Sequence, residues 1–452
     1  MIPDRPRLAR TVHARLHVVD DEAKYVLTDL RTGRVMEISP ESWRALVHAD
    51  GTRDLDALCL ALARDGLYRG QADLVQLLEE LSAVGVLEDG LAAPAPAPPV
   101  ARETTPLDRE LEVLPDFTLV CDGRGSCCRF YGSVSFSPRE AMKATLLADD
   151  LDLVIDSDHL FTPAMGAELD GTRAVAQVEG RCVFLHGARC GLHALGGPTA
   201  KPLPCRHYPA MLMDDGERVR VSLGPECACV FASLGRSDGE PLVPAHAKTL
   251  EDLGPVEPMR VPDPVPVSAM RTATRAELRE WTLRFSRSLA SARDCAALCA
   301  GLASAIEERG LDAAWQEPAI SITQDWLRAL GARAETGLET EQSWRAKSDL
   351  SRRVAAWIAH SLEDADAAAL FEAPRVDAHE QFYLRALAHG CRLSLEGRTL
   401  VHGLRDRATR LLASRAMAAR RIEPIEPSTE VPLALLEAAM RNLGLGSYAD
   451  RL

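Results

Sequence analysis

Three short apolar runs, each bounded by polar turn residues, open the chain. They are ARLHVVD (14–20), AKYVLTDL (23–30) and GRVMEIS (33–39). Valine, leucine and tyrosine favour strands, and the Asp20–Asp21 and Thr32–Gly33 dipeptides favour turns between them. We therefore expect three short strands at the beginning of the chain.

The apolar spacing then changes to the period of a helix. SPESWRAL (39–46) has Ser39 in an N-cap position and Pro40 at the first helical position. Two stripes with the spacing of an amphipathic helix follow, namely Leu55, Leu58, Cys59 and Leu62, then Leu74, Leu77, Leu78, Leu81 and Val84. Three strands followed by three helices predict a small α+β domain of the winged-helix type.

Two proline-rich segments mark the predicted domain boundaries. Alternating alanine and proline in GLAAPAPAPPVARETTP (90–106) cannot support a helix or a central strand, so this segment is expected to be extended. Such a linker allows the first domain to move relative to the rest. The predicted division is a winged-helix domain at 1–90, a linker at 91–115, a cysteine-rich domain of loops and strands at 116–240, a proline-rich connection at 241–270 and an α-helical domain at 271–452.

The last of these segments has helical spacing. Thr274 and Glu277 form a predicted capping box. Apolar stripes follow at Leu278, Trp281, Phe285 and Leu289, at Leu298, Leu302 and Ile306, at Trp326, Leu327 and Leu330, and at Val354, Trp357 and Ile358. We expect a bundle of packed helices here.

Composition narrows the class of protein. Of 452 residues, 46% are hydrophobic and 26% charged, as in a soluble globular protein of more than one domain. The net charge of -14 disfavours nucleic acid and anionic membranes as partners and leaves a peptide or protein surface. No apolar run is long enough for a membrane helix, and the N-terminus lacks the apolar core of a signal peptide. We therefore expect a cytoplasmic protein.

Cysteine usage changes this picture most. In a large chain in a reducing compartment, 12 cysteines indicate metal or redox chemistry rather than disulfides. Eight of them fall in one segment: Cys121, Cys127, Cys128, Cys182, Cys190, Cys205, Cys227 and Cys229. Glycine or proline flanks nearly every one, which is typical of loops that wrap a small centre. We predict all eight as metal ligands.

Regular elements are expected to hold these loops. Ser137 as N-cap, Pro138 at the first helical position and Glu140 as capping-box partner predict a helix after the first cysteine group. ERVRVSLGPECACVF (217–231) predicts a strand that ends at Cys227 and Cys229.

Thiolate sulfur is a soft ligand that suits an iron–sulfur cluster, iron or zinc. A zinc site or a [4Fe–4S] cluster takes four ligands, so eight cysteines allow two centres, or one centre and additional working thiols. His186, His193 and His207 lie in the same loops as candidate nitrogen ligands. The spacing matches neither a zinc ribbon nor a bacterial ferredoxin.

Two arginines and several other residues are weighed separately. Arg129 and Arg206 each follow a cluster cysteine, where they would hold an anionic cofactor or offset the thiolate charge; surface ion pairs are the alternative. Cys295 and Cys299 share a helix face at i and i+4, yet their alanine and leucine neighbours favour a place in the core. Core or surface roles are also predicted for Cys59, Cys391, His389 and His402. No catalytic motif or general base is evident.

Residues 1–90 resemble the PqqD-like family, in the order YVLTDLRTGRVMEISPESWRALVHADGTRDLDAL…VQLLEELSAVGVLED. Members of that family recognise the leader of a ribosomally made peptide. The resemblance implies that a peptide or protein substrate adds as a strand at a sheet edge of this domain. A winged-helix module that serves only as a prop between domains is the alternative.

The cysteine segment resembles the YkgJ-type cysteine-cluster family, described as zinc- or iron-chelating. The signature is CDGRGSCCR, then GRCVFL…ARCGLH, then KPLPCRHYP. The commonest form of the motif has a further cysteine where this chain has Arg124, and Cys227 and Cys229 are candidates to compensate.

Flagellin lysine N-methylase, a larger relative of that family, also joins such a cluster to a helical region. The stretch EQFYLRALAHGCRLSLEGRTLVHGLRDRA is similar in style. This resemblance implies methyl transfer from S-adenosylmethionine to protein lysines, although no glycine-rich methyltransferase motif is present. We expect a metal-dependent enzyme that modifies a peptide or protein side chain. A non-catalytic metal-binding or metal-sensing adaptor and a metal delivery protein remain the alternatives.

Overall fold

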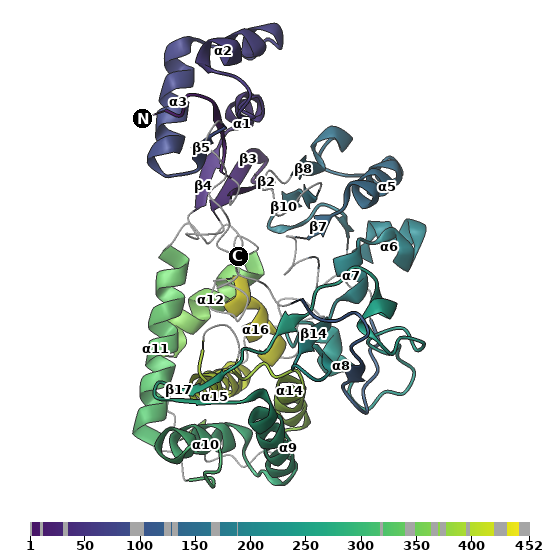
Figure 1. The fold of residues 1–452 in the computed structure, drawn as a ribbon, viewed down its shortest axis with the longest axis vertical. Coiled ribbons are helices and arrows are strands. Elements are labelled where there is room, and N and C mark those ends of the chain that lie inside the picture. The colour runs from purple at the N-terminus through teal and green to yellow at the C-terminus, as the bar shows by residue number, and fades with distance from the viewer. Residues whose placement is uncertain are drawn as a thin grey trace. The chain divides into compact units, whose positions relative to one another are not determined.

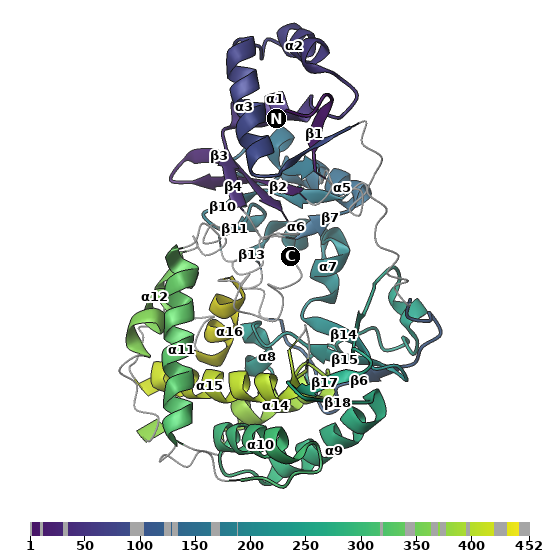
Figure 2. The same cartoon turned by 60° about the vertical axis from the view of Figure 1, so that its left-hand side comes forward.

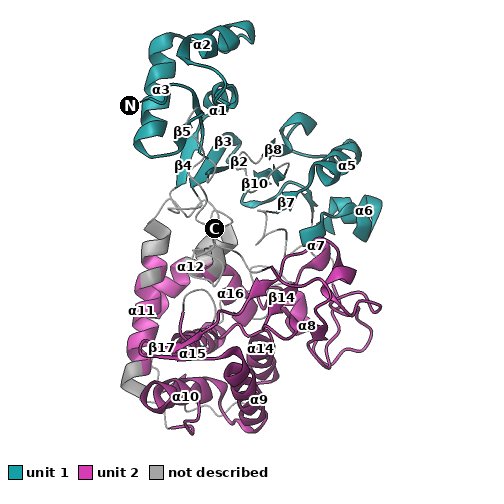
Figure 3. Ribbon diagram, viewed as in Figure 1, with its two compact units in different colours: residues 1–103, 127–204, 452 teal, residues 104–126, 205–451 magenta. Residues whose placement is uncertain are grey.

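Helices and strands both occur throughout the computed structural model, so the predicted α+β class is confirmed. The model describes residues 2–9, 12–29, 35–90, 104–121, 128, 134–163, 172–187, 189–316, 320–339, 349–362, 369–370, 377–394, 398–419 and 432–442. The chain divides into two units (Figure 3). Unit 1 comprises residues 1–103 and 127–204 with residue 452, and unit 2 comprises residues 104–126 and 205–451.

The three strands expected at the beginning of the chain form an antiparallel meander in unit 1. They are β2 (Val12–Val19), β3 (Glu22–Asp29) and β4 (Val35–Ile38). Tyr25 on the central strand lies opposite Leu16 on one side and Ile38 on the other. Asp20 and Asp21 form the two-residue turn with positive φ values of 52° and 62°, a conformation that aspartate tolerates.

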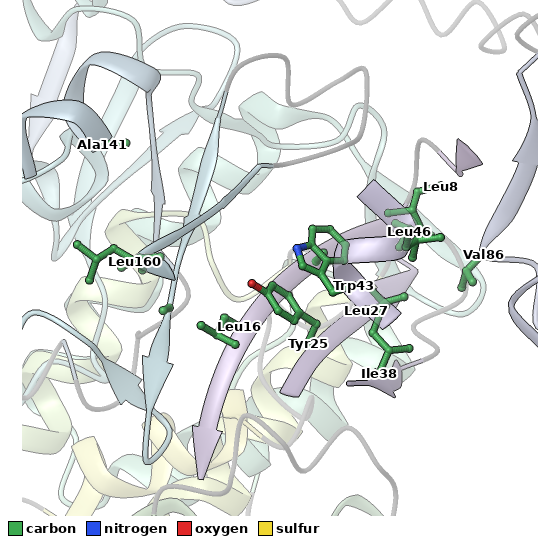
Figure 4. Packing of buried hydrophobic residues seen from close by; sticks show 14 of the residues in the cluster. Leu8, Leu16, Tyr25, Leu27, Ile38, Trp43, Leu46, Val86, Ala141 and Leu160 are labelled. Atoms are coloured by element: carbon green, nitrogen blue, oxygen red, sulfur yellow. The ribbon is translucent and has the colours of Figure 1, made fainter. Parts of the chain in front are cut away.

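Three helices cover this meander, as the spacing predicts. They are α1 (Pro40–Val47), α2 (Leu55–Arg64) and α3 (Gln71–Ala83). The Ser39 side chain accepts a hydrogen bond from the backbone N–H of Ser42, which confirms the predicted N-cap. Trp43 of α1 stacks on Tyr25 with ring centres 4.7 Å apart (Figure 4). A short pair, β1 (Pro6–Leu8) with β5 (Leu87–Asp89), closes the module.

The same sheet continues into the cysteine segment. β10 (Gln177–Val178) pairs in parallel with β2, and β11 (Arg181–Cys182) follows it at the edge, so the strand order is β11-β10-β2-β3-β4. Phe136, Leu160 and Phe184 belong to the same buried apolar cluster as Leu16 and Leu27 (Figure 4). The predicted linker therefore does not separate two units; residues on both sides of it share one core.

Short elements make up the rest of unit 1. They are β7 (Ser135–Phe136), α5 (Pro138–Ala148), η1 (Ser157–His159), β8 (Phe161–Pro163), β9 (Arg173–Val175), β12 (Leu185–His186), β13 (Arg189–Cys190), α6 (Gly191–Gly196) and η3 (Pro198–Ala200). β7, β9 and β8 form a three-stranded antiparallel sheet. The Ser137 and Glu140 capping box is present at the beginning of α5. This helix buries Ala141, Ala144 and Ala148.

Unit 2 contains a second sheet of order β16-β14-β15-β6. Its strands are β6 (Leu111–Val113), β14 (Ala210–Asp214), β15 (Val219–Leu223) and β16 (Met259–Arg260). Asp214 is fully buried at the end of β14, and its carboxylate lies 3.2 Å from the Nε of Arg260. Around the sheet lie α7 (Leu203–His207), α8 (Ala228–Ala232), η4 (Leu250–Leu253), β17 (Val265–Ser268) and β18 (Arg271–Ala273).

Helices dominate the last part of the chain, as predicted (Figures 1 and 2). They are α9 (Arg275–Ser291), α10 (Cys295–Arg309), α11 (Ile320–Glu339), α12 (Asp349–Ser361), α14 (Ala378–His389), α15 (Leu400–Ala419) and α16 (Pro432–Asn442). α15 packs against α10 and buries charged groups as well as apolar ones. The Glu437 carboxylate of α16 accepts hydrogen bonds from Tyr383, Arg407 and Arg410. None of the described helices is long and apolar enough to span a membrane.

Candidate thiolate site

Two cluster cysteines that lie far apart in the sequence meet in unit 1. Cys190 ends the β12–β13 hairpin and is the N-cap of α6, and the Cys128 thiol donates a hydrogen bond to its sulfur. Both side chains are half-buried and contact the edge of the unit 1 core. The hairpin positions Cys190 because Leu185, its partner across the pair, is buried and anchors the turn.

The surroundings of Cys190 favour the thiolate. The hydrogen bond from Cys128 is the main cause that lowers the pKa of Cys190 to about 6, against the opposing effect of burial. The backbone N–H groups of His193 and Leu192 and the charge of Lys201 act in the same direction as Cys128. A thiolate at neutral pH is the form that binds metal ions and attacks electrophiles. Cys190 therefore has the chemistry that a metal ligand requires.

The remaining predicted ligands of unit 1 are less clearly arranged. Cys182 of β11 is 9% exposed and lies in the same apolar cluster, opposite Gln177 of β10. His186 and His193 are exposed, and partial burial followed by the charge of Lys201 lowers the pKa of His193. Cys127 and Arg129 lie outside the described residues. Within the described part of the chain, no group of three or more histidine, cysteine, aspartate or glutamate residues is placed to hold a metal ion.

The other four predicted ligands belong to unit 2. Cys121 is exposed, Cys205 is half-buried on α7, and Cys227 and Cys229 are each 6% exposed at the beginning of α8. Each unit thus carries part of the predicted cluster, and the role of these four as ligands stays a prediction. None of the cysteines in the described ranges forms a disulfide.

Arg206 and His207 directly follow Cys205 on α7. Arg206, the predicted anion-holding residue beside Cys205, is exposed. His207 is half-buried, and burial lowers its pKa, with a further contribution from the charge of Arg206.

The helical cysteines occupy the core, as their apolar neighbours predict. Cys295 and Cys299 are 1% and 0% exposed, and burial raises the pKa of Cys295 to about 12 and that of Cys299 further above its usual range. Cys391 is also buried, with a pKa raised to about 12. These thiols stay protonated and are poor metal ligands. His389 is satisfied, with its Nε2 3.0 Å from the carbonyl oxygen of Glu112.

A pocket among the helices of residues 1–90 is a feature that sequence spacing does not reveal. It has a volume of about 470 Å³ and lies between α1, the α2–α3 connection and α3. Leu62, Leu67 and Leu77 supply apolar walls, and charged residues of both signs surround them: Glu41, Arg44, Arg69, Asp73 and Glu80. It begins at the first turn of α1, directly after β4, the strand at the outer edge of the sheet.

No protein-family model, curated protein or solved structure matches the chain. By its fold and by this site, the chain is an α+β protein of two units, with a pair of cysteine thiols that meet in unit 1.

Proposed function

We propose that the chain is a metal–thiolate protein that modifies a side chain of a peptide or protein held by residues 1–90. The observation that carries this proposal is the Cys128–Cys190 pair, in which the hydrogen bond from Cys128 lowers the pKa of Cys190 to about 6. The pair is built on the same core as the winged-helix sheet, so a metal centre and a peptide-recognition module would belong to one unit.

The donor set supports iron, as an iron–sulfur centre, or zinc. Two sulfur atoms converge, one of them a thiolate, and soft thiolates select these metals. Cys182 and Cys127 are the proposed further ligands in unit 1, and Cys121, Cys205, Cys227 and Cys229 those of a second centre. An iron–sulfur centre would supply electron transfer, whereas zinc would supply a Lewis acid. The protein residues hold the centre through Cys190, whose charge the backbone N–H groups of α6 stabilise.

The sheet supports peptide binding at one edge. β10, followed by β11, covers the side of the sheet beyond β2, whereas β4 has no further strand beside it among the described residues. An open edge offers backbone donors and acceptors to an added strand, and the adjacent pocket between α1 and α3 would receive a side chain of the peptide. This is the mode that the PqqD-like resemblance implies.

Lysine N-methylation with S-adenosylmethionine as methyl donor is the most concrete version of the proposed reaction, and it rests on the resemblance alone. A non-catalytic metal-binding adaptor is the second candidate. One observation favours it: among the described residues, no cysteine lines the pocket between α1 and α3, so this pocket brings no thiol to a bound peptide.

The metal assignment is tested first. Protein purified anaerobically and analysed for iron and zinc should contain metal, and Cys190→Ser and Cys128→Ser should each lose the metal of the unit 1 centre. Cys59→Ser is the matched control, because Cys59 is a half-buried cysteine of the same unit that is outside the pair. Equal metal content in all four proteins would contradict the assignment.

The reaction is tested separately. Calorimetry with S-adenosylmethionine and mass spectrometry of a lysine-containing acceptor protein distinguish the methylase from the adaptor. Binding and transfer of methyl groups support the enzyme. A protein that holds metal but does not bind S-adenosylmethionine is the adaptor.

A further inference from the structure

A second pocket lies in unit 2, and none of the predicted metal ligands is among its described lining residues. Its volume is about 360 Å³, and it is bounded by α9, α14 and the two residues Leu234 and Gly235 that follow α8. Phe382 forms part of its wall and is held in an aromatic cluster, with ring centres 5.0 Å from Phe117 and 6.4 Å from Phe231. The wall is therefore rigid, and Leu289 and Ala290 of α9 face it with apolar surface.

Arg385 is the unusual member of this pocket. Its guanidinium carbon lies 5.4 Å from the centre of the Phe382 ring, and its Nε is buried without a hydrogen-bond partner among the described residues. No ion pair of Arg385 with a carboxylate occurs within the described ranges either. Its charge also contributes, after burial, to lowering the pKa of His389 one turn along α14.

Other buried arginines of unit 2 show what is missing. Arg407 and Arg410 both oppose Glu437, at 3.1 and 2.8 Å, and Arg415 lies 2.7 Å from Glu380. A guanidinium in a partly apolar site loses hydration, and a facing carboxylate normally offsets that loss. Arg385 is half-buried with its Nε enclosed, has no facing carboxylate among the described residues, and lines a cavity instead.

We propose that this pocket binds a small monocarboxylic acid with an apolar body. Arg385 pairs with the carboxylate, for which its planar fork is suited, and Phe382 with Leu289 contacts the body. Among the described lining residues Arg385 carries the only charge, which matches a ligand of charge -1 rather than a phosphate. Gln381 and Ser286 offer additional polar groups. The inference is independent of the proposed function, because no cysteine lines this pocket.

The test uses the full chain and isothermal titration calorimetry with 3-phenylpropionate and 4-methylpentanoate. At least one of the two acids should bind, while 3-phenylpropanamide and inorganic phosphate should bind at least about tenfold more weakly. Arg385→Gln should weaken binding of the acid by about tenfold or more. Arg287→Gln, an exposed arginine of α9 outside the pocket, should leave binding unchanged.

Two further measurements distinguish a loss of binding from misfolding of the variant. Arg385→Gln should melt at the wild-type temperature or above, because it removes a desolvated charge that has no anion to lose. Ala290→Trp, which fills the pocket from an exposed helix position, should block binding while Arg385 remains. Absence of binding by both acids at millimolar concentration, equal binding by Arg385→Gln, or equal affinity for phosphate would each overturn the proposal.

Discussion

The two units use pairs of cysteines in opposite ways. In unit 2, Cys295 and Cys299 are brought together by a single helix turn, buried among alanines and leucines, and held as thiols by a raised pKa. In unit 1, Cys128 and Cys190 come from distant positions, lie half-buried, and share a proton so that Cys190 is ionised at neutral pH. The comparison shows that closeness in sequence does not set the ionisation of a thiol; the environment of the sulfur does.

Alkylation rates should show the largest difference between the pairs. In metal-free protein at pH 7, a thiol of pKa near 6 is about nine-tenths thiolate, whereas one of pKa near 12 is about one part in 100,000. Iodoacetamide should therefore modify Cys190 at least about 100-fold faster than Cys295, as followed by peptide mass spectrometry. Faster modification of Cys295 in the folded protein would reverse the comparison.

Placing a fixed negative charge at each site should give the next largest effect. Cys299→Asp places a carboxylate in a fully buried site, where the effect of burial outweighs the charge of Arg407, and should destabilise unit 2 by about 4 kcal/mol. Cys190→Asp puts the charge where backbone N–H groups already stabilise a thiolate and should cost less than about 1 kcal/mol. Denaturant unfolding, followed by hydrogen exchange in the peptides that cover α10 and α6, measures the destabilisation at each of the two sites separately.

Asparagine at the same positions is the matched control for that experiment, because it keeps the shape and removes the charge. At position 299, the free energy of unfolding should be much lower for the Asp variant than for the Asn variant. At position 190, the two values should be similar, or the Asp variant should be the more stable. Equal differences would mean that the two sites have the same electrostatic environment.

Helix caps should give a smaller effect that is the same in both units. Ser137→Ala at α5 and Thr274→Ala at α9 each remove a capping box and should each cost about 1 kcal/mol, measured as faster hydrogen exchange in the first turn of the helix. Ser288→Ala, an exposed position within α9, should cost much less. A cost confined to one unit would show that the helix of the other unit is held by tertiary packing alone.

The smallest effect concerns acid sensitivity of unit 2. Burial is the main cause that lowers the pKa of His389, so the unfolded chain takes up the proton more readily than the folded protein. This contribution to stability is fully present when the pH is above the pKa of His389 in the unfolded chain, about 6.5. It is lost as the pH falls from that value toward the lower pKa of His389 in the folded protein. Between pH 7.5 and 5.5, the melting temperature should fall less in His389→Gln than in the wild type.

Local patterns predicted many elements correctly. Ser39, Ser137 and Thr274 cap helices as their spacing indicates, because a cap depends on residues only three positions apart. The burial of Cys295 and Cys299 follows from their apolar neighbours on one helix. In contrast, the two residues of β10 carry no period that identifies their parallel partner in β2. The domain boundary drawn at the proline-rich linker therefore differs from the observed units, since that long-range pairing joins residues on either side of it.

The sequence by itself determined the α+β class, the strands and helices of the first module and the helical end of the chain. It also showed the grouping of eight cysteines, although Cys182, Cys190, Cys205 and Cys229 lie on short strands and helices rather than in loops. Only the tertiary structure decided that Cys190 meets Cys128, that Cys182 enters the core beside the first sheet, and that Arg385 faces a cavity instead of a carboxylate. The reason is physical. Capping and amphipathic spacing act over a few residues, whereas the ionisation of a thiol or the pairing of a buried charge depends on groups that chain folding brings from far away.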